Sequence, residues 1–270
     1  MRQTAMRRSV AAFLCLLAWS GSGAGPARAQ DRPAVVAAAA DLTFALGEVA
    51  AAFTRDTGLH VRVTYGSSGD LARQIAQGAP FEMLLSADER YVFALRDQGL
   101  TRGEGALYAV GRLALFTPRG SPIPLDPALE GLRAAVRGGR VSRLAIANPD
   151  HAPYGRAAQE VLTRLGIWAR VQPALVRGEN ASQAMQFAAS GSCQGGLVPL
   201  ALVSAPAAAA RGPFQLVPAE WHSPLRQRMV LTVKAGATAS AFYDYVRRGP
   251  GVRETLARFG FEPPPGEAAR

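Results

Sequence analysis

The chain has 270 residues, of which 30 are Lys or Arg and 20 are Asp or Glu, giving a formal charge of +10 at pH 7. The basic residues are scattered and no basic stripe carries interleaved aromatic residues, so the charge does not indicate a nucleic-acid surface. The length is enough for two α/β lobes of roughly 100 residues each.

The first 29 residues have the pattern of an export signal. Arg2, Arg7 and Arg8 precede an apolar run over 10–19, and Ala27-Arg28-Ala29 has the small-residue pattern of a cleavage site. We therefore predict cleavage after Ala29 and a periplasmic protein. No later segment reaches 18 consecutive apolar residues, the length of a candidate membrane span.

Cleavage at this position would remove one of the two cysteines, Cys15, and leave Cys193 alone. A single cysteine cannot form an intramolecular disulfide, so we expect Cys193 to be a buried free thiol that packs as a small apolar side chain.

Strands and helices alternate from residue 34 onward, which indicates α/β layers with largely parallel sheets. Apolar runs predict strands over 34–39, 60–65, 81–86, 113–117, 144–147, 195–198 and 228–233. Helical periodicity predicts helices over 42–57, 70–77, 89–98, 158–165, 181–188, 237–247 and 252–259. The segment 118–127 is rich in turn residues, and we expect the tail from Pro263 to be disordered.

Two of these strand ends carry small polar residues at the start of the next helix. Ala40-Asp41-Leu42 follows the first strand, and Gly66-Ser67-Ser68-Gly69 follows the second. The backbone N–H groups at a helix start have no partner within the helix, and the helix dipole is positive there, so two such starts favour binding of a small oxyanion. We find no Ser/His/Asp order, no pair of catalytic acids and no phosphate loop, so the sequence predicts a receptor rather than an enzyme.

Several motifs together resemble the periplasmic molybdate-binding proteins of ABC transporters, which are type II periplasmic binding proteins. The matching segments run in order along the chain: 38–42, 66–69 with 71–75, 78–80, 85–88, 147–149 with 152–155, 178–181, 195–198, 241–246 and 258–261.

The resemblance implies an α/β fold of two lobes with a hinge and a central ligand cleft. Lobe one would comprise 30–110 plus 225–270, and lobe two 111–224. It also implies a monomer that captures molybdate or tungstate and delivers it to an ABC transporter permease in the membrane. The metal would enter only as the oxyanion, with no separate cofactor and no nucleic acid involved.

The resemblance further implies a ligand site of neutral hydrogen-bond donors, comprising Asp41, Leu42, Ser67, Ser68, Tyr154, Asn180 and Ala181. Ser68 would donate its hydroxyl and backbone N–H, and Ala181 a backbone N–H at the helix start after Asn180. Some relatives have a ligand-binding tyrosine where this chain has Pro199, which cannot donate. The phenol of Tyr154 would replace that donor; otherwise Tyr154 is a packed aromatic residue.

Asp41 departs from the family pattern, because relatives often have Ser or Asn there. A carboxylate about 4 Å from a dianion would repel it by several kcal/mol at an effective dielectric constant near 20. We expect Asp41 to cap the following helix, accepting from the N–H of Thr43 or Phe44 while its own N–H faces the ligand. Alternatively, Asp41 is protonated, or the natural ligand is less charged.

Two alternatives to molybdate remain at this stage. One keeps the fold and changes the ligand to a phosphonate or an organic acid. The other is an enzyme on this fold, such as porphobilinogen deaminase, which carries its cofactor on a loop cysteine; Cys193 follows Gly191-Ser192. The predicted export of this chain and the absence of the arginine-rich pyrrole-binding pattern argue against that enzyme.

The histidines show no metal-ligand spacing. We expect His60 to be exposed and His151 to have a surface or capping role near the cleft. Arg73 and Arg156 lie near helix starts, and we expect them to be solvated.

Overall fold

A computed structural model describes residues 32–266. The predicted signal, with its cleavage after Ala29, lies outside the described residues, as does the end of the predicted tail. The described part of that tail is short, and Pro264 within it is buried. Within the described range, no helix combines the length and apolar character needed to cross a membrane.

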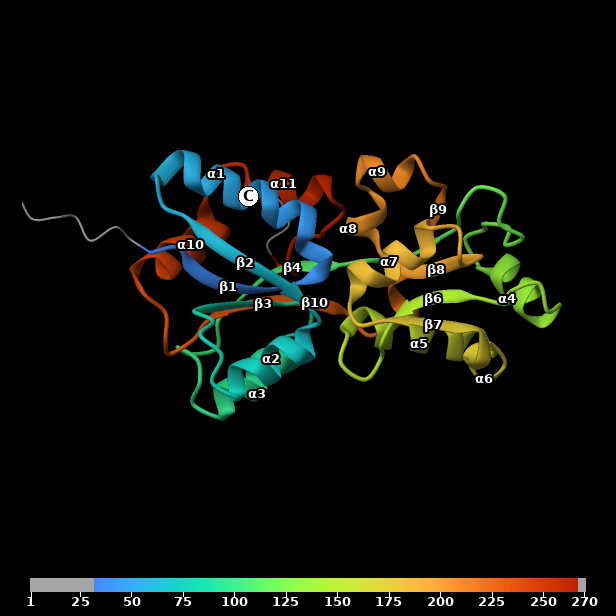
Figure 1. The fold of residues 1–270 in the computed structure, drawn as a ribbon, viewed down its shortest axis with the longest axis horizontal. Coiled ribbons are helices and arrows are strands. Elements are labelled where there is room, and N and C mark those ends of the chain that lie inside the picture. Colours follow the sequence, from blue (N-terminus) through green and yellow to red (C-terminus); the bar gives the residue numbers. More distant parts are fainter. Residues whose placement is uncertain (1–31, 267–270) are drawn as a thin grey trace, which may run out of the picture. The chain divides into compact units, whose positions relative to one another are not determined.

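The first sheet has the strand order β2-β1-β3-β10-β4 (Figure 1). β1 pairs in parallel with β2 and β3, whereas β10 is antiparallel to β3 and β4. Its strands are β1 (Ala34–Ala39), β2 (Val61–Gly66), β3 (Met83–Ser86), β4 (Ala106–Gly111) and β10 (Leu225–Leu231).

The second sheet repeats this arrangement with the order β7-β6-β8-β5-β9. β6 is parallel to β7 and β8, and β5 is antiparallel to β8 and β9. Its strands are β5 (Leu113–Phe116), β6 (Leu144–Ala147), β7 (Leu175–Gly178), β8 (Gly195–Pro199) and β9 (Phe214–Leu216).

Helices cover both faces of the first sheet. Successive side chains of β1 point to opposite faces, and apolar side chains on each face pack against helices. Val36 and Ala38 pack in a core with α1, α10 and α11, while Ala37 packs on the other face with α2 and α3 (Figure 1). The helices are η1 (Ala40–Leu42), α1 (Thr43–Thr57), α2 (Ser68–Ala76), α3 (Glu89–Asp97), α10 (Ala237–Arg248) and α11 (Val252–Arg258).

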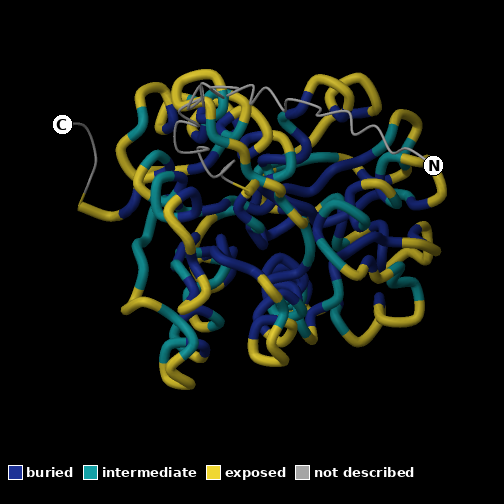
Figure 2. The backbone as a smooth tube through the Cα atoms, turned by 60° about the vertical axis from the view of Figure 1, so that its left-hand side comes forward, coloured by how far each residue is buried: buried dark blue, intermediate teal, exposed yellow. Residues whose placement is uncertain are grey.

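The second sheet has a core of its own, which includes the expected buried free thiol of Cys193. Figure 2 shows buried stretches of the chain in the interior and exposed stretches mainly at the outer bends. The helices around this sheet are α4 (Glu130–Arg137), α5 (Pro153–Arg164), α6 (Trp168–Val171), η2 (Gln172–Ala174), α7 (Ala181–Ala189), α8 (Leu200–Val203), α9 (Pro206–Ala209) and η3 (Ala219–Trp221).

The chain passes from the first sheet to the second between β4 and β5, and returns between β9 and β10. The described residues belong to one compact unit. The lobe boundaries, 30–110 plus 225–270 and 111–224, therefore stay a prediction.

The α/β alternation predicted from the sequence is confirmed, but several short elements were missed. β4 was missed because only Arg112 separates it from β5. α4 was missed because it follows a turn-rich segment; it starts after Leu129, whose φ of 52° is left-handed, and the Asp126 carboxylate accepts from the N–H groups of Glu130 and Gly131. β7 has only two consecutive apolar residues, Leu175 and Val176, and β9 has only three residues, so neither gives a clear strand pattern.

Candidate functional site

A small cavity lies where loops from the carboxyl ends of parallel strands in both sheets meet. Its volume is small, about 10 Å³, and its lining comes from the loops after β1, β2, β3, β6 and β7. The lining residues are Ala39, Ala40, Asp41, Gly66, Ser67, Ser68, Ala87, Ala152, Pro153, Tyr154 and Ala181. Ligands of open α/β sheets bind at this end of the strands.

Three helices begin at this cavity. α2 starts at Ser68, α5 at Pro153 and α7 at Ala181, and each of these residues lines the cavity. Each helix start turns the positive end of a helix dipole toward the cavity, which favours a small anion. Pro153 has no N–H, and the N–H groups of Gly69, Asp70 and Gln183 are already bonded. The N–H groups of Ser68, Tyr154 and Ala181 are therefore the candidate backbone donors.

The two serines of the α2 loop have different roles. Ser67 caps α2, because its hydroxyl oxygen accepts from the N–H of Asp70 at 3.2 Å. The hydroxyl oxygen of the fully buried Ser68 accepts from the N–H of Ala87 at 2.9 Å. That bond uses Ser68 as an acceptor, so its own proton is left to donate into the cavity.

Asp41 and Tyr154 bring two further polar groups to the cavity, and both residues are buried. The Nε2 of Gln227 donates to Asp41 Oδ2 at 2.7 Å, whereas Asp41 Oδ1 and the Tyr154 hydroxyl have no hydrogen-bond partner. Burial raises the pKa of Asp41 to about 6, and interactions of its carboxylate with the Tyr154 hydroxyl, the Gln227 amide and the backbone N–H groups of Asp41 and Leu42 offset part of that effect. The Tyr154 hydroxyl thus lies beside the Asp41 carboxylate, although the two atoms do not form a hydrogen bond of normal geometry.

The predicted capping role of Asp41 is wrong. The N-cap position of α1 is Leu42, and no side chain caps this helix. Asp41 lies one residue earlier, within η1, and its carboxylate turns toward Gln227 on β10 instead of toward Thr43 or Phe44.

Two other predicted site residues do not line the cavity. The side chain of Leu42 is fully buried in the core between the first sheet and α1. Asn180 caps α7, because its Oδ1 accepts from the N–H of Gln183 at 3.0 Å. Asn180 therefore acts by ordering the helix start at which Ala181 meets the cavity.

His151 connects the loop after β6 to the start of α2. Its Nδ1 lies 2.8 Å from the Ser67 hydroxyl and 3.2 Å from Asp70 Oδ2. On the other side of the ring, Nε2 lies 3.0 Å from Asn148 Nδ2 and 3.6 Å from Glu179 Oε2. The predicted surface or capping role therefore describes only part of what His151 does, because its side chain connects elements of both sheets.

Asp70, His151 and Glu179 are a possible metal-ligand set, because their ligand atoms lie within 4.8 Å of one another. The two ring nitrogens, however, face different carboxylates. The imidazole therefore also bridges the two carboxylates, with Nδ1 nearest Asp70 and Nε2 nearest Glu179.

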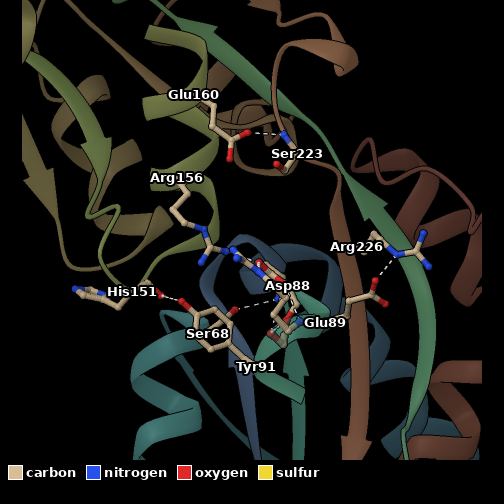
Figure 3. Close-up of polar contacts among 12 residues, drawn as sticks. Ser68, Asp88, Glu89, Tyr91, His151, Arg156, Glu160, Ser223 and Arg226 are labelled. Carbon is tan, nitrogen blue, oxygen red and sulfur yellow. Dashed lines mark hydrogen bonds and ion pairs between the residues drawn. The ribbon is translucent and has the colours of Figure 1, made fainter. Parts of the chain in front are cut away.

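Arg156 is half-buried rather than solvated as expected. Its guanidinium pairs with Asp88 and lies 5.7 Å from the ring centroid of Tyr91, which connects α5 to α3 (Figure 3). A wider hollow nearby is lined by this pair and by Arg226, whose charge is paired with Glu89. Arg73 is exposed and pairs with Asp70, and His60 is exposed as expected.

Two contributors to the site were not identified from the sequence. Ser182 donates its hydroxyl to the carbonyl oxygen of Ala40 at 2.8 Å, joining α7 to η1. Gln227 left a signal in the sequence, because it occupies the inward-facing position between Leu225 and Met229, which are both buried. A polar residue in that alternating position indicates a buried polar partner.

Two mixed α/β sheets whose loops meet at a small cavity, with three helix starts on its wall, are the architecture typical of a solute-binding protein. The chain belongs to the bacterial extracellular solute-binding protein family, whose model matches residues 34–262.

Known proteins similar to this chain agree with that class. It is 36% identical over 231 residues to the molybdate-binding protein ModA of Rhodobacter capsulatus, covering 84% of this chain and 87% of that protein. It is 34% identical over 244 residues to ModA of Azotobacter vinelandii, covering 89% and 94%. The solved periplasmic molybdate-binding protein of Azotobacter vinelandii superposes with a TM-score of 0.77 at 30% identity, over 86% of this chain and 99% of that one. The expected type II binding-protein fold is confirmed.

Proposed function

We propose that this protein is exported to the periplasm, captures molybdate or tungstate in the cavity between its two sheets, and delivers it to the membrane permease of an ABC importer. The observation that carries the proposal is the meeting of three helix starts at one cavity. The names of its relatives supply the identity of the anion.

Neutral donors would hold the oxyanion. Ser68 contributes its free hydroxyl proton, and Ala181 contributes the N–H at the start of α7. The Tyr154 hydroxyl, which lies beside the Asp41 carboxylate without a hydrogen bond of normal geometry in the described residues, supplies a further donor. Hydrogen bonds from such groups are stronger inside a closed cavity than in water, because the local dielectric constant is lower.

Selection between oxyanions would rest on size. Molybdate, tungstate and sulfate are tetrahedral dianions, so their charge cannot distinguish them. The walls of the cavity are rigid backbone and small side chains, including Ala39, Ala87 and Ala152, so a smaller anion would leave some donors unpaired. An unpaired buried donor costs about 1–3 kcal/mol.

The test is calorimetry and thermal unfolding of the chain beginning at Gln30, with molybdate, tungstate, sulfate and phosphate at matched ionic strength. We expect one molybdate or tungstate per chain and no binding of sulfate. At a free ligand concentration one hundred times Kd, bound ligand stabilises the fold by about 2.7 kcal/mol. Equal stabilisation by sulfate and molybdate contradicts the proposal.

Asp41 favours a second candidate on the same fold, a phosphonate or an organic acid, because a buried acid beside the cavity suits a less charged or protonated ligand. The same calorimetric series with methylphosphonate and citrate separates the two. Tighter binding of either compound than of molybdate would select this second candidate.

Export and oligomeric state have their own measurements. Mass spectrometry of the protein from the periplasmic fraction should show a chain that begins at Gln30. Light scattering with and without molybdate should show a monomer.

A further inference from the structure

Two neighbouring residues of the small cavity each have a buried polar atom that makes no hydrogen bond of normal geometry within the described part of the chain. Asp41 Oδ1 and the Tyr154 hydroxyl have no hydrogen-bond partner, although their residues are only 1% and 2% exposed. Both residues line the cavity beside Ser68. Buried polar atoms normally have a partner, so two such atoms at one cavity indicate a ligand that completes them.

The carboxylate of Asp41 is held in place by a chain of hydrogen bonds. The Tyr108 hydroxyl donates to Gln227 Oε1 at 3.2 Å, so the amide of Gln227 must direct its Nε2 to Asp41 Oδ2. Gly111 leaves the space this requires: a Cβ there would lie 2.2 Å from the Tyr154 hydroxyl and 2.9 Å from Gln227 Nε2. Because Oδ2 accepts from Gln227 Nε2, Oδ1 is the carboxylate oxygen left for a ligand.

Within the described residues, no cationic side chain acts on the Asp41 carboxylate to offset its charge. The ionisable side chains that act on Asp41 are the phenols of Tyr108 and Tyr154, and burial raises the pKa of both well above 10, so both are neutral. Among the elements packed against η1, α7 and α8 have no ionisable side chain, and α1 has none before Glu48. β2 brings Tyr65, with a pKa raised to about 12, and Arg62, which is exposed and lies near the other end of the strand, paired with Val35.

We infer that the captured oxyanion shares one proton with Asp41, so that binding of a dianion at neutral pH takes up one proton from solvent. This inference rests on the proposed function, because it describes how the same site accepts its anion. Without the proton, Asp41 Oδ1 and the ligand oxygen are two acceptors facing each other. With it, one becomes a donor, and the repulsion between a carboxylate and a dianion is removed.

The proton balance is simple. One proton leaves the solvent and is held between Asp41 Oδ1 and an oxygen of the anion. The metal–oxygen bonds of the anion and the carbon–oxygen bonds of the Asp41 carboxyl group stay intact. The Tyr154 hydroxyl keeps its own proton and donates to the anion. The raised pKa of Asp41, about 6 in the unliganded fold, lowers the free energy needed to add this proton at neutral pH.

The experiment is titration calorimetry with sodium molybdate at pH 7.5 in buffers of different ionisation enthalpy, whose slope gives the protons taken up per ligand. We expect about one proton for the unmodified protein, and a Kd that rises about tenfold per pH unit above pH 7. In Asp41→Asn the uptake should be close to zero and the Kd independent of pH.

His151→Gln is the matched control, because this imidazole is another ionisable group near the cavity. Its proton uptake should equal that of the unmodified protein. Uptake that survives in Asp41→Asn and disappears in His151→Gln would overturn the inference.

A second measurement does not depend on how well the Asp41 variant folds. Difference infrared spectra of the unmodified protein at pH 7.5 should gain a protonated-carboxyl band when molybdate is added. Molybdate binding with no proton uptake and no such band refutes the shared proton but leaves the proposed function standing. If none of the tested oxyanions binds, the proposed function itself fails.

Discussion

The imidazole Nδ1 of His151 lies 2.8 Å from the hydroxyl of Ser67, which caps one of the helices that begin at the cavity. The backbone of His151 reinforces this contact: its carbonyl oxygen accepts from the N–H of Gly69 at 3.0 Å and from the Tyr91 hydroxyl at 3.3 Å (Figure 3). His151, in the loop after β6, thus contacts three residues on the side of the first sheet: Ser67, Gly69 and Tyr91. The cavity lies beside these contacts.

Removing the imidazole should therefore speed ligand release. In His151→Ala the ring contacts to Ser67 and Asp70 are lost while the carbonyl contacts remain, and a hydrogen bond of about 1 kcal/mol corresponds to a release rate about fivefold higher. Stopped-flow displacement of bound molybdate measures this rate. His60→Ala, at an exposed position, is the control and should release at the original rate. Equal release rates in the unmodified protein, His151→Ala and His60→Ala would show that the ring contact does not slow ligand release.

A methyl group at Gly69 should block the same contact more severely. A Cβ at this position would lie 2.7 Å from the carbonyl oxygen of His151, so Gly69→Ala must push the two loops apart. We expect the molybdate Kd to rise by more than in His151→Ala. Gly47→Ala is the matched control, because nothing lies within 4 Å of its Cβ position in α1. It should stabilise the helix by about 0.5–1 kcal/mol and leave the Kd unchanged. Unchanged affinity in Gly69→Ala would mean that ligand binds without this contact.

Ser68→Ala tests the hydroxyl donor. The substitution removes a proton donor from the ligand and also the acceptor for the buried N–H of Ala87. We expect molybdate binding to weaken by about 1–3 kcal/mol and the unliganded fold to lose stability as well. Calorimetry and urea unfolding separate the two effects. Ser190→Ala, at an exposed position, controls for the loss of a hydroxyl. Full molybdate affinity in Ser68→Ala would remove this residue from the site.

Much of the fold could be predicted from the sequence because its main elements repeat a strong local pattern. The segment Leu144–Ala147 is a four-residue apolar run and forms β6 with those bounds, and Ala34–Ala39 forms β1. In these segments, burial on both faces of a parallel strand leaves an uninterrupted apolar run. β9 could not be predicted, since three residues whose pairing with β5 is set by the fold carry no period.

The site was predictable where it depends on local chain geometry. Ser67 and Ala181 lie at helix starts that the helical period and the small polar residues indicate. The environment of Asp41 was not predictable, because its partner Gln227 is 186 residues away on a strand added from the far end of the chain. Capping propensity describes only how a side chain bonds to N–H groups near it in the chain. In the fold, the Asp41 carboxylate bonds to the distant amide of Gln227 instead.

Asp41 should also make the stability of the unliganded protein depend on pH. Burial raises the pKa of Asp41 from 3.8 to about 6, so the folded state binds this proton more tightly than the unfolded chain does. Between these two values the folded state holds more protons, and this contribution to stability therefore falls as pH rises from about 4 to about 6 and stays low above that range.

A shift of about two pKa units corresponds to about 3 kcal/mol. Asn carries no titrating proton but keeps an oxygen that can accept from Gln227 Nε2. The free energy of unfolding of Asp41→Asn relative to the unmodified protein should therefore rise by up to about 3 kcal/mol between pH 4 and pH 7, then level off. Urea unfolding of both proteins at half-unit pH steps, without any oxyanion in the buffer, measures this difference directly. Other carboxylates titrate alike in the two proteins and cancel. A difference that does not change with pH would show that Asp41 has no raised pKa in the fold.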